Sequence, residues 1–122
     1  MRILVVDDHR NTREALALGL SHVSADVRTA GSAAAAMLEL ERFDCDWLVC
    51  DVRMPVMDGI ELMQRVRVAR PEIRILLMTA YDVTAYERQT IADAGAVLLI
   101  KPVTADAVAV RCGAIRGAGG SV

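Results

Sequence analysis

The sequence predicts an α/β fold in which helices cover both faces of a five-stranded parallel sheet. Three observations support this prediction: short apolar runs and helical patterns alternate five times, four of the runs are nearly continuous in apolar residues, and capping or turn residues separate the segments. A half-exposed strand alternates apolar and polar side chains, so continuous runs indicate strands that are buried on both faces. The 122 residues suffice for one domain with its own hydrophobic core.

The first two βα units occupy the N-terminal part of the chain. The first run is residues 2–6, and Asn11 followed by Glu14 has the capping-box spacing that opens a helix. The second run, residues 26–30, is short and half polar, as expected of an edge strand. Ser32 is placed to cap an alanine-rich helix that extends to about residue 42.

The third unit contains the most unusual loop of the chain. Its strand is the run at residues 47–50, and the loop "DVRMPVMDG" follows. Asp58 and Glu61 stand at capping-box spacing and open a helix that ends near Arg70, where Pro71 stops continuation.

The last two units complete the pattern. The fourth run, residues 73–78, precedes a weakly amphipathic helix over residues 83–94 that Gly95 ends. The fifth run, residues 96–100, precedes a helix that Thr104 caps. Five such units in this length predict a doubly wound parallel sheet in the flavodoxin-like order 2-1-3-4-5. We expect residues 1–116 to form the domain and residues 117–122 to be a linker-like tail.

Composition excludes several classes of protein. Apolar residues make up 54% of the chain and charged residues 25%, which argues against disorder. The formal charge of −2 and the lack of a basic cluster predict no direct binding of nucleic acid. The longest apolar runs are far shorter than the ~18 residues that span a membrane, so we expect a cytoplasmic domain. Cys45, Cys50 and Cys112 are odd in number and lack CxxC spacing, so we expect free thiols.

Chemically distinctive residues follow the predicted strands. Asp7 and Asp8 follow the first strand, and Asp51, Thr79 and Lys101 follow the third, fourth and fifth. In a doubly wound sheet, ligands bind beyond the carboxyl ends of the strands, near the point where the strand order reverses. We therefore expect three carboxylates, one hydroxyl and one ammonium group to share a single hollow.

Three neighbouring carboxylates repel one another unless one is protonated or a cation is bound. An all-oxygen set of ligands favours Mg²⁺, with Mn²⁺ possible, over zinc. His9 adjoins the acids, but we expect its side chain to point elsewhere. A carboxylate beside such an ion is suited to act as a nucleophile toward phosphorus, with Asp51 in that role. Lys101 and Thr79 would contact the phosphoryl oxygens, and Arg53 would offer its backbone carbonyl to the metal while its side chain leans over the site.

The motifs "VVDD", "VCDVRMPVMDG", "LMTA" and "LIKPV", in this order, resemble the response-regulator receiver domains of two-component signalling. The resemblance covers about residues 1–116. It implies phosphorelay signal transduction in which Asp51 accepts a phosphoryl group from a phosphohistidine of a sensor kinase or phosphotransfer protein. It also implies a Mg²⁺ ion held by Asp8, Asp51 and the Arg53 carbonyl, with Asp7 acting largely through water. Such a protein promotes its own phosphorylation and dephosphorylation but is not a turnover enzyme.

The resemblance carries further expectations. The bond between Lys101 and Pro102 should be cis. An effector or partner is expected on the face formed by residues 83–116, and the kinase on the first helix and the loops around the acids. Phosphorylation could also drive dimerisation.

One position departs from the family pattern. The family usually carries Tyr or Phe three residues before its lysine, where this chain has Leu98. We expect phosphorylation chemistry to survive this change, whereas transmission of the signal needs another route, to which Tyr81 is a candidate contributor. Arg53 and Tyr81 each stand two residues beyond a site residue, and we expect them to tune the lifetime of the phosphoaspartate.

Three other readings compete with this one. A haloacid-dehalogenase-type phosphatase would place an acid two residues after its nucleophile, where this chain has Arg53. A flavodoxin-like cofactor binder needs Ser, Thr and Gly in its first loop, where this chain has "DDHR". A non-phosphorylated pseudo-receiver, which acts as a protein-interaction module, is the main alternative, although this chain retains all five key residues.

Overall fold

The computed structural model describes residues 1–23 and 26–115, so the expected tail at 117–122 lies outside the described residues. The strands are β1 (Arg2–Val6), β2 (Asp26–Ala30), β3 (Trp47–Asp51), β4 (Arg74–Thr79) and β5 (Val97–Ile100). The helices are α1 (Arg10–Ser21), α2 (Ala33–Leu40), α3 (Gly59–Ala69), α4 (Ala85–Asp93) and α5 (Ala105–Cys112). All strands pair in parallel in the order β2-β1-β3-β4-β5, which confirms the predicted topology.

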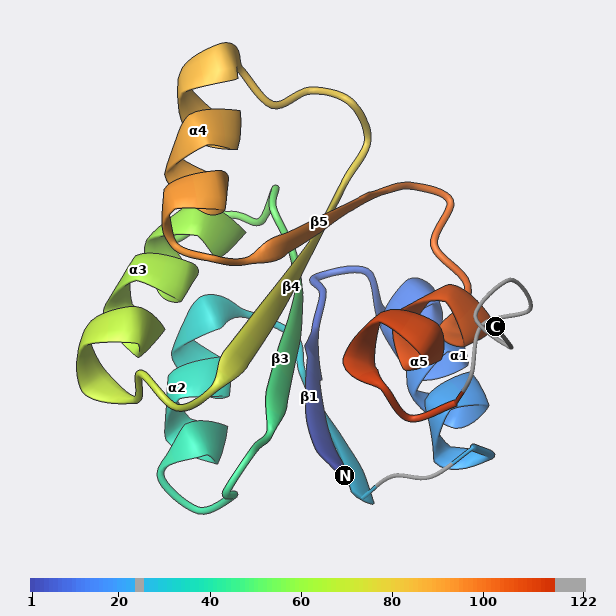
Figure 1. Cartoon of the computed structure of the whole chain (residues 1–122). Helices are drawn as coiled ribbons and strands as arrows, with labels where there is room; N and C mark the ends of the chain where they lie inside the picture. Colours follow the sequence, from blue (N-terminus) through green and yellow to red (C-terminus); the bar gives the residue numbers. More distant parts are fainter. Residues whose placement is uncertain (24–25, 116–122) are drawn as a thin grey trace.

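Helices cover the two faces of the sheet unequally (Figure 1). Helices α1 and α5 lie on one face, and α2, α3 and α4 lie on the other. The strands supply both layers of the core, because alternate side chains point to opposite faces. In β1, Ile3 and Val5 pack with α1 and α5, whereas Leu4 and Val6 pack against the layer of α2 and α3.

The predicted edge strand is an edge strand. Strand β2 lies at the end of the sheet, and three of its five residues are exposed. Charged and polar side chains there are compatible with its position, because an edge strand is covered less completely than a central one.

Helix caps match the sequence in three cases and differ in one. Side chains of three predicted caps accept a backbone N–H from the first turn of their helices: Ser32, Asp58 and Thr104. The prediction that Asn11 caps the first helix is wrong. Helix α1 begins at Arg10 after His9, which makes no side-chain capping bond. The predicted strands at residues 2–6 and 26–30 match the observed bounds, and the other predicted boundaries differ from the observed ones by at most two residues.

The loop between β3 and α3 is held by close backbone contacts. The N–H of Met57 donates to the carbonyl of Pro55 at 2.9 Å, and Val56 between them has a φ of 70°. The N–H of Gly59 donates to the Val52 carbonyl at 2.8 Å. A Cβ at Gly59 would overlap the carbonyl oxygen of Asp51, so only glycine fits at this position.

The three cysteines are buried and free, as expected. Burial raises the pKa of Cys45 to about 11 and that of Cys112 to about 12. Thiols with such pKa values are largely protonated at neutral pH and therefore react slowly.

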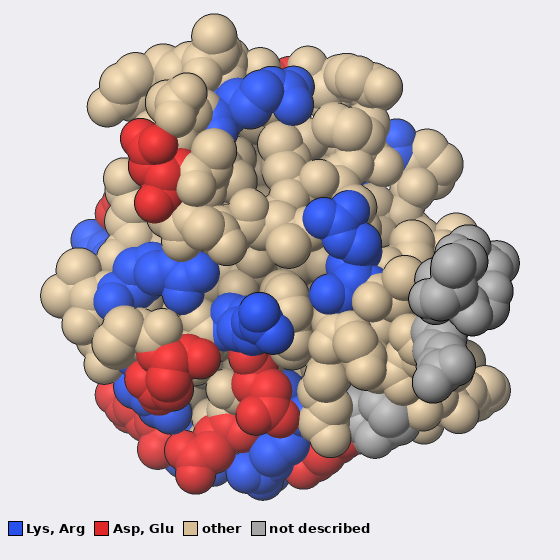
Figure 2. Space-filling model, in the orientation of Figure 1, with Lys and Arg blue, Asp and Glu red and all other residues tan. Residues whose placement is uncertain are grey.

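No helix within residues 1–23 and 26–115 is long and apolar enough to cross a membrane. On the face shown in Figure 2, basic side chains are separated by uncharged surface or lie beside acidic ones. The charged side chains on this face are densest toward the amino ends of the strands.

Candidate functional site

Four predicted site residues meet at the carboxyl edge of the sheet. Asp51 is the last residue of β3 and pairs in register with Met78 of β4, so Thr79 follows directly beside it. The N–H of Lys101 donates to the Thr79 carbonyl at 2.7 Å, which fixes the start of the loop after β5. The Lys101 ammonium lies 3.0 Å from Oδ2 of Asp51 and 3.9 Å from Oδ2 of Asp7.

The acids of this site are buried and incompletely compensated. Asp7, Asp51 and Thr79 are almost fully buried. Burial raises the pKa of Asp51, and the hydrogen bond and charge of Lys101 oppose that rise. Within residues 1–23 and 26–115, Oδ2 of Asp7 and Oδ1 of Asp8 have no hydrogen-bond partner. Buried carboxylate oxygens without a partner are costly, so this arrangement favours the binding of a cation.

His9 turns toward the acids, so the prediction that its side chain points elsewhere is wrong. Its Nδ1 lies 3.4 Å from Oδ1 of Asp7 and 3.4 Å from Oδ1 of Asp8. The cause is local, because Oδ1 of Asp7 accepts the backbone N–H of His9 at 2.9 Å and so turns the chain back over the carboxylates. The imidazole is largely exposed and lies at the outer side of the acidic hollow.

These groups fit a divalent cation. Asp7, Asp8, His9 and Asp51 each offer one ligand atom, and these atoms lie within 4.8 Å of one another. Three of the four residues offer carboxylate oxygens, which suit Mg²⁺ or Mn²⁺. Asp7 and Asp8 of this group each have a buried oxygen that makes no hydrogen bond within the described residues, so the cluster has spare ligand capacity.

The side chain of Arg53 contacts two acids that sequence reasoning missed. Its Nε donates to Oδ2 of Asp82 at 2.9 Å, and its two Nη atoms donate to both carboxylate oxygens of Glu87 at 2.9 and 2.8 Å. Thr79 donates its hydroxyl to Oδ1 of Asp82 at 2.8 Å. The guanidinium thus spans from the end of β3 to the start of α4, next to the Thr79 side of the site.

The sequence carries a signal for one of these acids. Thr84 and Glu87 have capping-box spacing, and both reciprocal capping bonds are present at the start of α4. No comparable pattern marks Asp82, because its contacts depend on how the loop after β4 turns. Arg53 holds the pKa of Glu87 at about 2, below its usual value.

The two other residues singled out near the site have different surroundings. Leu98 is half-buried, pairs in register with Leu77 and packs against the core layer under α2, α3 and α4. Tyr81 is exposed and has a φ of 73°, which is rare for a residue with a side chain. The peptide bond between Lys101 and Pro102 is cis, as expected.

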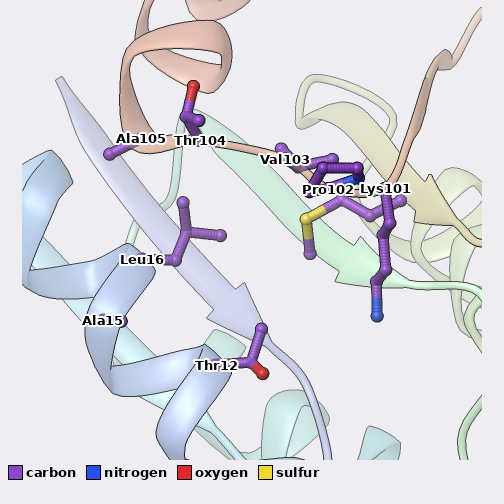
Figure 3. Close-up of a pocket in the computed structure, with 9 residues that line it drawn as sticks. Thr12, Ala15, Leu16, Lys101, Pro102, Val103, Thr104 and Ala105 are labelled. Atoms are coloured by element: carbon purple, nitrogen blue, oxygen red, sulfur yellow. The ribbon is translucent and has the colours of Figure 1, made fainter.

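A groove runs beside the site between α1 and the start of α5 (Figure 3). It encloses about 320 Å³, with residues of α1 on one side and residues 101–105 on the other. The Lys101 side chain forms part of its wall and extends to the carboxyl ends of the strands. The remaining lining is mostly small or apolar and includes Thr12, Ala15, Leu16 and Met78.

Residues 3–112 match the family described as the response regulator receiver domain. The matched range covers most of the chain and includes every residue of the acidic hollow. The chain belongs to this family. Receiver domains are signalling modules of two-component systems, and an acidic pocket that binds Mg²⁺ is typical of them.

Individual relatives agree with this assignment. Response regulator MprA of Mycobacterium leprae is 41% identical over 96 residues, which cover 79% of this chain and 42% of MprA. The receiver domain thus spans less than half the length of this relative.

Solved structures confirm the fold. A CheY-like receiver domain protein from Methanospirillum hungatei has a TM-score of 0.85 at 24% identity, over 92% of this chain and 90% of that chain. Chemotaxis protein CheY4 of Vibrio cholerae has a TM-score of 0.82 at 26% identity, over 92% of this chain and 95% of that chain.

Proposed function

We propose that this receiver domain carries a phosphoryl group on Asp51, which it accepts from a phosphohistidine of a sensor kinase or phosphotransfer protein. The observation that supports this proposal most is the position of the Asp51 carboxylate. It is buried at the tip of a central strand, 3.0 Å from the Lys101 ammonium, beside two carboxylates with partnerless oxygens. A buried carboxylate with a cation on one side and spare ligand oxygens on the other suits attack on phosphorus.

The transfer is an in-line displacement. An oxygen of Asp51 forms a bond to phosphorus, the phosphorus–nitrogen bond of the donor breaks, and the imidazole regains a proton from solvent. Lys101 lies where it would neutralise charge on a phosphoryl oxygen, and the Thr79 hydroxyl would donate to another. Hydrolysis of the acyl phosphate by water restores the carboxylate.

Asp8, Asp51 and the Arg53 carbonyl are proposed to hold Mg²⁺, with Asp7 acting largely through water. When bound, the ion supplies positive charge to the equatorial phosphoryl oxygens. The partnerless oxygens of Asp7 and Asp8 support this choice, since they are the buried acceptors that the protein leaves free. Mn²⁺ has similar ligand preferences and is expected to substitute.

The switch is proposed to act through Thr79 and the segment behind it. A phosphoryl group on Asp51 adds charge and acceptor oxygens, so it favours the state in which Thr79 and Lys101 contact it. The face predicted from residues 83–116 is the proposed surface for an effector domain, a partner or a phosphorylation-dependent dimer, and the structure describes it as far as residue 115. The groove between α1 and residues 101–105 adjoins Lys101, so the phosphodonor protein is proposed to bind there and on the loops around the acids.

Intact-mass spectrometry after incubation with acetyl phosphate and Mg²⁺ tests the proposal. The wild-type domain should gain the mass of one phosphoryl group, and Asp51→Asn should gain none while keeping its circular dichroism spectrum. Lys101→Ala should be labelled about 100-fold more slowly, because it removes a donor to the transferred group. Chelation of the metal should also suppress labelling.

Asp44→Asn is the matched control. Asp44 is an exposed acid that pairs with Arg70 and precedes β3, at the opposite end of the strand from Asp51, so the labelling of this variant should equal that of wild type. Wild-type protein without an adduct would contradict the proposal and favour the interaction module. Labelling of Asp51→Asn at the wild-type level would place the chemistry at another residue.

A further inference from the structure

We infer that Asp82 is a positioning residue that holds the Thr79 hydroxyl away from the phosphoryl group, and that Arg53 keeps Asp82 in place. Phosphorylation of Asp51 then has to compete with Asp82 for this hydroxyl. The inference rests on the proposed phosphorylation of Asp51 and adds a residue that sets its strength.

Thr79 has a single hydroxyl proton to donate. Its Oγ1 lies 2.8 Å from Oδ1 of Asp82, and its side chain is almost fully buried. A hydroxyl donates one hydrogen bond at a time, so Thr79 donates either to Asp82 or to a phosphoryl oxygen. The bond to the Asp82 carboxylate is charge-assisted, so releasing the hydroxyl from it has a measurable cost.

The Arg53 guanidinium bonds to both the carboxylate and the backbone carbonyl of Asp82. Nε of Arg53 donates to Oδ2 of Asp82 at 2.9 Å, and Nη2 donates to the Asp82 carbonyl at 2.7 Å. The same guanidinium donates to both carboxylate oxygens of Glu87. A planar guanidinium bound at four points has little freedom, so the Asp82 carboxylate is presented to Thr79 in one orientation.

The loop conformation supports the same geometry. Tyr81 lies in the left-handed region with a φ of 73°, and it turns the chain between Thr79 and Asp82. Thr84 and Glu87 then close the capping box that begins α4. Arg53 therefore bonds to Asp82 in the loop and to Glu87 in the first turn of α4, which restrains the segment between them.

This arrangement also links the site to α4 without an aromatic residue at position 98. When Thr79 turns to a phosphoryl group, the Asp82 carboxylate loses one donor and keeps its bond from Arg53. Because Arg53 also contacts Glu87 in the first turn of α4, a change at Thr79 reaches that helix through two consecutive ionic contacts. Leu98 needs only to remain packed in the core.

A double-mutant cycle tests the inference. The affinity of each variant for beryllofluoride in the presence of Mg²⁺ is measured by isothermal titration calorimetry. Asp82→Ala should bind beryllofluoride roughly 3- to 10-fold more tightly than wild type, the range expected for one net hydrogen bond. Thr79→Ala should bind more weakly than wild type. In the Thr79→Ala background, adding Asp82→Ala should change the affinity by less than about twofold, because no hydroxyl remains to be released.

Glu61→Gln is the matched control for charge. Glu61 is an exposed acid of α3 that pairs with Arg65, so its substitution removes a negative charge without disturbing the bonds of Arg53, and the affinity should stay within about twofold of wild type. An equal gain from Asp82→Ala with and without Thr79 would show that Asp82 acts only by its charge, and would overturn the inference. An unchanged affinity of Asp82→Ala would overturn it as well. Wild-type protein that binds no beryllofluoride would instead contradict the proposed function.

Discussion

The two ends of the sheet differ in how far their charged side chains are paired. At the amino end, Arg2 pairs with Asp26 at 3.5 Å, and its backbone N–H donates to Asp46 at 2.7 Å. The guanidiniums of Arg2 and Arg28 lie over the Phe43 ring at 4.8 and 4.6 Å. Every one of these charges has a partner, and the contacts join the first strands to the segment before β3.

At the carboxyl end, three carboxylates face one ammonium group. Two of their oxygens make no hydrogen bond within the described residues, although basic groups lie 3.9 and 3.4 Å from them, and burial raises the pKa of Asp51. The comparison shows that the same sheet uses charge for stability where the strands begin and leaves charge uncompensated where they end. Uncompensated negative charge is costly in a binding site without its ligand, and it is the property that a cation site requires.

The largest expected effect on stability comes from a substitution in the Phe43 cluster at the amino end of the sheet. Phe43→Ala should lower the free energy of unfolding by about 3–5 kcal/mol, because the ring is fully buried and two guanidiniums lie over it. Urea denaturation measures this change. Leu38→Ala, at an exposed position, is the control and should change stability by less than about 0.5 kcal/mol. A loss below about 1 kcal/mol for Phe43→Ala would show that this cluster contributes little.

A smaller effect of opposite sign is expected at the carboxyl end. The raised pKa of Asp51 means that its charged form is less favourable in the folded state, so at neutral pH the charge costs stability. Without metal, Asp51→Asn should therefore melt about 4 °C higher than wild type, corresponding to roughly 1 kcal/mol in a domain of this size. Differential scanning calorimetry in chelator measures the shift.

Asp26→Asn is the matched substitution at the amino end, where the acid is paired with Arg2. It should leave the melting temperature unchanged or slightly lower. Saturating Mg²⁺ should abolish the difference in melting temperature between Asp51→Asn and wild type, because the ion binds the intact cluster of wild type more tightly. A melting temperature of Asp51→Asn at or below that of wild type in chelator would refute the assignment of uncompensated charge to this end.

The smallest effect is expected for the exposed ion pairs of Arg53. These lie near the carboxyl end of the sheet, yet both acids involved have a partner. The depressed pKa of Glu87, about 2, means that its contribution to stability is present above its ordinary pKa of 4.5 and is lost as pH falls toward 2. Glu87→Gln should melt below wild type at about pH 6, and the difference should shrink at about pH 3. Glu61→Gln, whose acid pairs with Arg65 on the same helix, serves as the control. A difference independent of pH would assign the effect to packing.

The strands and the strand-end residues could be predicted because they follow from local sequence. A continuous apolar run is informative by itself, and the carboxyl ends of parallel strands necessarily meet at one edge. The sequence therefore predicts that four residues lie together, namely Asp7, Asp51, Thr79 and Lys101. Ser32, Asp58 and Thr104 could be assigned as caps for a similar reason, since a cap acts within one turn of its helix.

The errors and omissions concern loops. Asn11 has capping-box spacing, yet the chain turns two residues earlier because Asp7 accepts the N–H of His9. The same turn brings the imidazole of His9 against the acids. Asp82 is 29 residues from Arg53, and a contact of that kind depends on the path of two loops rather than on either sequence alone.

Gly59, which begins α3, restricts which part of the domain can change conformation. Its lack of a side chain lets the helix start against the main chain of residue 51, and its N–H bonds to the carbonyl of residue 52. The backbone that bears the Asp51 carboxylate is thus held by a helix on one side and neighbouring strands on the other. If the proposed phosphorylation holds, the acceptor residue stays in place, and the change of shape is expected in the loop that carries Asp82.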